Sequence, residues 1–164
     1  MAIFQDKPDE WQRLDWSILR GGGISLYCKI KILEKDIEWF KKEHYSIVDF
    51  DCQTWTDEKE MHKQLSYRLN FPDYYGKNFD ALNDCLSDVE ILNAGKVITL
   101  WHLDNFDKKR VHILLDIFAN NTRLQMLFGK RFIVLAQVDN PNYVIDRVGA
   151  TPIMWNRAEW LDES

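Results

Sequence analysis

Two carboxylates that lie one helical turn apart, Asp80 and Asp84, are the residues of this chain best placed to do chemistry. On a helix of about 3.6 residues per turn they share one side with Asn83 and Ser87. The opposite side is apolar and consists of Ala81, Leu82, Cys85 and Leu86. The helix dipole explains an acid in the first turn, as at Asp80, but not one at Asp84. A row of exposed carboxylates can accept charge-assisted hydrogen bonds from the Arg and Lys side chains of a basic partner.

The charge around these residues is strongly negative. Residues 73–90 hold five acids and one base, Lys77, which gives −4 of the chain's net charge of −5. An acidic helix face is most often simply solvated, so the pattern alone does not establish a site. A metal site is the weaker alternative, because Asp80 and Asp88 would lie about 12 Å apart along the helix axis and could not share an ion. We therefore expect no metal and no cofactor.

The histidines do not form a catalytic group in the sequence. His44, His62, His102 and His112 are scattered, and no nucleophile motif accompanies them. We interpret His102 as a satisfied core or strand-end residue and His112 as a solvated residue on a helix. The sequence thus predicts no catalytic residues and a protein that is not an enzyme.

Composition places the chain among ordinary globular proteins. A length of 164 residues, of which 46% are hydrophobic, suits a single domain over residues 1–164. The acidic charge argues against direct binding of nucleic acid, and no apolar run is long enough for a membrane span. Charged residues interrupt any signal peptide near Met1, and three cysteines without a C-x-x-C spacing favour reduced thiols. We expect a cytoplasmic protein that is a monomer when free.

Hydrophobic periodicity predicts alternating strands and helices. Strands are expected over residues 24–28, 46–52, 96–103, 131–137 and 150–155, and helices over residues 33–45, 57–69, 79–88 and 108–128. Thr56 and Asn78 are the expected N-caps of two of these helices. This alternation predicts an α/β fold with a mostly parallel sheet that is flanked by helices.

One segment carries a family resemblance. Phe71-Pro-Asp-Tyr-Tyr-Gly-Lys-Asn-Phe-Asp-Ala-Leu-Asn-Asp-Cys-Leu86 resembles the signature of the barstar family of bacterial ribonuclease inhibitors. The order of elements over residues 46–138 is also similar to that of the family. The resemblance implies a three-layer α/β/α core over these residues. Residues 1–45 and 139–164 would be flanking extensions that pack on the core and add strands and one helix.

The resemblance also implies a mechanism and a set of partner-binding residues. Family members insert the second helix of the core and the loop before it into a ribonuclease active site, where carboxylates take the places of RNA phosphates. Asp80 is then the first acid, Asp84 the central phosphate mimic, and Tyr74 the aromatic that packs over a catalytic histidine. The full set of expected partner-binding residues is Tyr74, Gly76, Asn78, Asp80, Asn83, Asp84 and Ser87. Asn83 and Asn120 stand where the family usually has an aromatic residue and an acid.

These observations lead to two functional hypotheses. The first is an intracellular immunity protein, or antitoxin, that inhibits a secreted ribonuclease or nuclease toxin by mimicking RNA phosphates with an acidic helix and loop. The alternative is a barstar-like interaction module that has lost ribonuclease inhibition and binds another basic protein. The tryptophans near the two ends of the chain are interpreted as core packing between the termini rather than as an exposed surface; they are Trp11, Trp16, Trp155 and Trp160.

Overall fold

A five-stranded, fully parallel sheet forms the centre of the molecule in the computed structural model, which describes residues 3–149 and 151–161. Its order is β2 (Ser46–Asp51), β3 (Lys96–Trp101), β4 (Phe132–Gln137), β1 (Ile24–Tyr27) and β5 (Met154–Trp155). Every residue of β1 and of β4 is buried, as expected for strands that are covered on both faces. The expected α/β fold with a parallel sheet between helices is confirmed.

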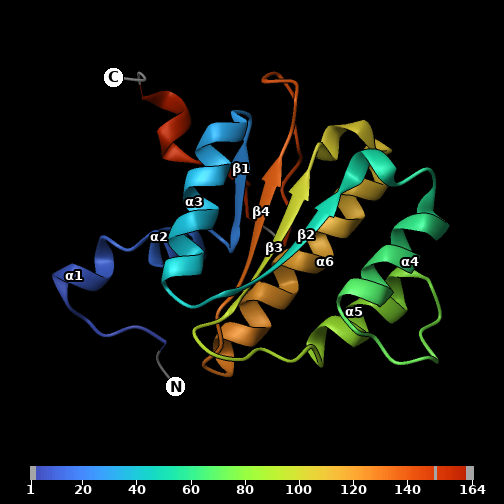
Figure 1. Ribbon diagram of the computed structural model, residues 1–164, viewed down its shortest axis with the longest axis horizontal. Helices are drawn as coiled ribbons and strands as arrows, with labels where there is room; N and C mark the ends of the chain where they lie inside the picture. The colour runs from blue at the N-terminus through green and yellow to red at the C-terminus, as the bar shows by residue number, and fades with distance from the viewer. Residues whose placement is uncertain (1–2, 150, 162–164) are drawn as a thin grey trace.

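Helices cover both faces of the sheet (Figure 1). On one face, α2 (Leu14–Arg20) and α3 (Ile30–Lys42) bury Ile18, Leu33 and Phe40 against Val97 and Ile133 of the strands. On the other face lie α4 (Glu58–Arg68), α5 (Phe79–Ser87) and the long helix α6 (Lys108–Leu127). The molecule therefore has three layers, and its larger core lies on the side of α4, α5 and α6.

The residues that precede the barstar-like region enter the sheet itself. β1 pairs with β4 on one side and with β5 on the other, so residues of both extensions continue the three-stranded part formed by β2, β3 and β4. Gly23, with φ of +89°, brings the chain close to Thr122 of α6, whose hydroxyl donates to the Gly22 carbonyl at 3.2 Å. A side chain at Gly23 would collide with Thr122, so this glycine permits the close approach.

The extensions contain more helix than the pattern predicted. Two short helices, α1 (Pro8–Trp11) and α2, precede β1, and α3 begins three residues earlier than expected. Asp15 of α2 is fully buried because Arg13, Arg131 and the Tyr45 hydroxyl bind its carboxylate. The 3-10 turns of the described residues are η1 (Cys52–Thr54), η2 (Leu103–Asn105) and η3 (Arg157–Trp160).

The structure corrects two other expectations, on the tryptophans and on the last strand, and also bears on a membrane span. The tryptophans do not form a core between the termini, because Trp11 is 48% exposed and Trp160 is 75% exposed. The last strand is shorter than predicted, Met154–Trp155, and Ala150 lies outside the described residues. In the part of the chain that the structure describes, no helix combines the length and the apolar character needed to cross a membrane.

Candidate functional site

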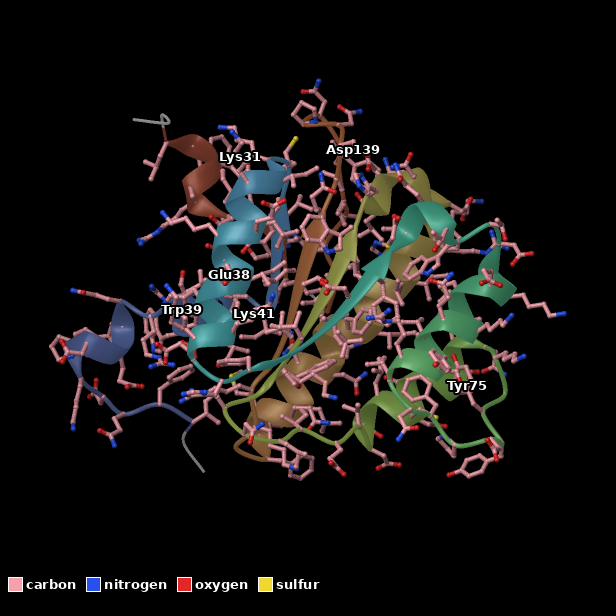
Figure 2. The ribbon with its side chains drawn as sticks, in the orientation of Figure 1. Lys31, Glu38, Trp39, Lys41, Tyr75 and Asp139 are labelled. Carbon is pink, nitrogen blue, oxygen red and sulfur yellow. The ribbon has the colours of Figure 1, made fainter. Side chains whose placement is uncertain are left out.

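The loop between α4 and α5 is held by an inward-facing tyrosine. Tyr75 is buried, its ring packs on Phe71 with centroids 5.0 Å apart, and its hydroxyl is 2.6 Å from Nδ1 of His62 in α4. The backbone N–H of Tyr75 donates to the Pro72 carbonyl at 3.0 Å, which closes a turn. Figure 2 labels Tyr75, which lies beside α4 and α5. The preceding residue, Tyr74, points outward and is 86% exposed.

The start of α5 is fixed by Asn78. Its side-chain oxygen accepts a hydrogen bond from the Ala81 N–H at 2.8 Å, and its amide donates to the Gly76 carbonyl at 3.4 Å. Asn78 is therefore the N-cap that the sequence predicted. The other expected N-cap, Thr56, is wrong, because the side chain of Asp57 caps α4 by accepting from the Glu60 N–H. Gly76 is exposed and does not have a positive φ; the left-handed residue of this turn is Lys77, at φ of 51°.

The two sides of α5 differ as expected. Leu82 and Leu86 are fully buried, whereas Asp80, Asn83 and Asp84 are exposed. Within the described residues, no ion pair or side-chain hydrogen bond engages the carboxylates of Asp80 and Asp84. We refer to the exposed side chains of Asp73, Tyr74, Asp80, Asp84 and Asp88 as the acidic face. Its carboxylates are available to a cationic partner.

Two of the expected contact residues are engaged inside the molecule instead. The Asn83 side-chain oxygen accepts a hydrogen bond from Nδ2 of Asn121 in α6 at 3.0 Å. Ser87 is half-buried, and its hydroxyl donates to the Asp84 carbonyl at 2.6 Å. The Asn83 bond ties α5 to α6, whereas the Ser87 bond lies within α5 itself. Both groups are therefore less available for a partner than the sequence suggested.

The long helix α6 supplies positioning residues that the sequence analysis missed. Asn121 is 2% exposed and bridges Asn83 and the Ile117 carbonyl. The Gln125 side chain donates to the carbonyls of Leu86 and Ser87 at the end of α5. Asn120, the neighbour of Asn121, is exposed and lies beside Gly149. Polar residues on an otherwise buried helix side were the available signal, because buried amides need partners.

No group of three or more His, Cys, Asp or Glu side chains in residues 3–149 and 151–161 could hold a metal ion. The strand-end role of His102 is confirmed, because its Nδ1 lies 2.8 Å from an Asp139 oxygen just after β3. The expectation that His112 is solvated is wrong, because the residue is half-buried and its Nδ1 has no partner among the described residues.

Comparisons with known proteins agree with this fold. A three-layer α/β protein with a fixed acidic helix is the class that the geometry defines. A model of the family described as "Barstar (barnase inhibitor)" matches residues 45–137, more than half of the chain, and the chain belongs to this family.

A curated relative and a solved structure add to this result. The chain is 59% identical over 27 residues to "Putative ribonuclease inhibitor YrdF" of Bacillus subtilis (strain 168). That match covers 16% of this chain and only 30% of the relative. The structure of Drosophila ORC bound to AT-rich DNA and Cdc6 is similar with a TM-score of 0.50 and 17% identity. The match covers 77% of this chain and 43% of the Drosophila chain, and it shows a likeness of fold alone.

Proposed function

We propose that the protein inhibits a ribonuclease by inserting the acidic face into its active site. The observation that carries the proposal is that Asp80 and Asp84 are exposed and unpaired on a helix held from behind by α6. An enzyme that cleaves RNA concentrates cationic side chains around the scissile phosphate. Carboxylates fixed at the spacing of α5 can accept hydrogen bonds from those side chains in place of phosphate oxygens.

The rigidity of α5 is as important as its charge. A carboxylate on a flexible segment would lose conformational entropy when it docks, whereas Asp84 is already in the middle of a packed helix. Leu82 and Leu86 anchor that helix in the core, and Gln125 fastens its end. Anionic groups that are held rigidly in this way lose little conformational freedom on docking, which would lower the cost of association.

The biological role that follows is protection of the producing cell. Family membership and the relative named as a ribonuclease inhibitor support a nuclease as the partner. The inhibitor would bind a secreted ribonuclease or nuclease toxin before export, and thereby act as an immunity protein. Tyr74 adds an exposed aromatic ring beside the acids, and such rings are frequent anchors of protein interfaces.

The decisive experiment is inhibition of RNA cleavage by purified protein. Barnase, which the family description names, is one probe, and nucleases encoded beside this gene are the others. We expect Asp84→Asn to weaken inhibition by about 30-fold to several thousand-fold, the usual effect of removing one partner of a hydrogen-bonded charge pair that is buried in an interface.

A matched control is available on the opposite face of the molecule. Glu34 of α3 is exposed, and Glu34→Gln removes one negative charge just as Asp84→Asn does. The control should inhibit as well as the parent protein. Equal inhibition by parent and Asp84→Asn would refute the plug mechanism. Binding without any inhibition of a nuclease would favour an interaction module for another basic protein.

A further inference from the structure

His62 contacts two residues that are the chain neighbours of members of the acidic face. It is fully buried in α4, and its ring contacts two residues that precede α5 or begin it. Nδ1 is 2.6 Å from the Tyr75 hydroxyl, and the ring meets Phe79 edge to face with centroids 5.1 Å apart. Tyr75 is the neighbour of Tyr74, and Phe79 is the neighbour of Asp80. A single side chain therefore contacts the attachment points of both the loop and the helix.

The surroundings of His62 determine how its ring is used. Among the residues that the structure describes, Nε2 has no hydrogen-bond partner, and it faces the Glu58 carboxylate at 3.7 Å. Arg110 of α6 binds the other Glu58 oxygen at 2.9 Å. Burial lowers the pKa of His62, although Glu58 opposes this effect. Burial also raises the pKa of Tyr75, so its hydroxyl keeps its proton. We assign the proton of the neutral ring to Nε2, toward Glu58, which leaves Nδ1 to accept from Tyr75.

We propose that His62 is a positioning residue that sets the relative placement of Tyr74 and Asp80 for partner binding. The inference rests on the proposed function, and it adds a residue that never touches the partner. His62 holds Tyr75 by a hydrogen bond and Phe79 by ring packing, so the loop and the first turn of α5 are both fastened to α4. Loss of the hydrogen bond between His62 and Tyr75 should free the loop, while the packing against Phe79 remains.

A purely structural role predicts a different residue. The site is enclosed by Tyr75 and Phe79, and an apolar side chain there would avoid the cost of burying Nε2 without a hydrogen bond. The polar ring is useful only if the Tyr75 hydroxyl has to be held in one place. This difference separates positioning from simple filling of the core, and it can be measured.

The first measurement does not depend on any partner. His62→Leu fills the space but cannot bind Tyr75, His62→Gln retains a polar group, and Tyr75→Phe removes the other half of the bond. Amide hydrogen exchange in the free protein should become about tenfold faster over residues 71–79 in His62→Leu and Tyr75→Phe, the effect of losing one net hydrogen bond. Unchanged exchange in both variants would overturn the proposal even if the protein inhibits a nuclease.

The second measurement uses barnase as the probe. The apparent dissociation constant should rise about tenfold in His62→Leu and in Tyr75→Phe, no further in the double variant, and less in His62→Gln. Ile37→Ala, in the core on the other face of the sheet, is the control: it lowers stability and should leave exchange at residues 71–79 and binding unchanged. Additive effects in the double variant would also overturn the proposal. Failure of the parent protein to bind barnase would count against the choice of partner alone, because the exchange data stand by themselves.

Discussion

Asn121 in the middle of α6 donates a hydrogen bond to the side-chain oxygen of Asn83 on α5, with 3.0 Å between Nδ2 and Oδ1. The two residues are 38 positions apart, and their bond joins the acidic helix to the longest helix of the molecule. Asn83 thereby serves the placement of its neighbour Asp84.

The first prediction concerns this bond. Asn121→Ala removes the bond to Asn83 and the bond to the Ile117 carbonyl, and it leaves a small cavity. We expect a loss of about 1–2 kcal/mol in the free energy of unfolding, measured by urea denaturation. The adjacent Asn120 is exposed, so Asn120→Ala should change stability by less than about 0.5 kcal/mol. Equal losses in the two variants would contradict the role of Asn121.

The second prediction concerns salt. Four carboxylates on the acidic face and a net charge of −5 should attract a cationic nuclease over a distance. Between about 10 mM and 1 M salt the screening length falls from about 30 Å to about 3 Å, so the association rate should drop by about one to three orders of magnitude. Stopped-flow kinetics can test this. Asp84→Asn should flatten the dependence, whereas Glu34→Gln should have a smaller effect; a salt effect confined to dissociation would argue against steering.

The third prediction concerns pH. Burial lowers the pKa of His62 in the folded protein. As the pH falls through the ordinary pKa of 6.5, the unfolded chain therefore binds a proton at His62 and the folded chain does not. The contribution of His62 to the free energy of unfolding is therefore fully present above pH 6.5. It decreases as the pH falls from 6.5 toward the lowered pKa. The groups that face the ring are Glu58, Tyr75 and Phe79, with Arg110 behind Glu58. Unfolding free energies measured between about pH 7.5 and pH 5.5 should show this slope, and His62→Gln should remove its share.

The fourth prediction concerns the extension at Gly23. Gly23→Ala places a Cβ against Thr122 at a φ of +89°, so it should destabilise the protein by about 1–3 kcal/mol or more. Gly21→Ala is the matched control, because its φ is −82° and its nearest neighbours would be at 3.5 Å.

A further prediction concerns the unfolding of residues 1–164. We expect them to unfold as one domain, so fluorescence and circular dichroism should report the same transition. A separate transition for the extensions would contradict the single domain.

Much of the fold could be predicted because local pattern and tertiary structure agree in its core. β2, β3, β4 and α6 end within two residues of the predicted limits. The apolar runs of β3 and β4, the alternating pattern of β2 and the long periodic pattern of α6 mark these boundaries. α2 could not be found in this way. Its buried Asp15 is satisfied by Tyr45 and Arg131, which are 30 and 116 residues away, and no local pattern contains such partners.

The charge of the candidate site could be predicted from the sequence, but the hydrogen bonds that engage Asn83 and Ser87 could not. The spacing of Asp80 and Asp84 indicated the side of the helix that faces solvent, and both residues are exposed. Asn83 and Ser87 share that side, yet their bonds to Asn121 and to the Asp84 carbonyl depend on neighbours that helical periodicity does not reveal. The place of β1 between β4 and β5 is likewise a tertiary fact, because no local signal specifies strand order.

Tyr74 and Tyr75 are adjacent in the chain and have opposite surroundings, since one is 86% exposed and the other is 8% exposed. The outer ring can therefore be altered without disturbing the inner ring on which the loop depends. A library that varies Tyr74, Asp80 and Asp84 and keeps Tyr75, Asn78 and His62 would explore new targets on an unchanged scaffold. The fold thus separates a residue that can vary from a residue that supports the loop.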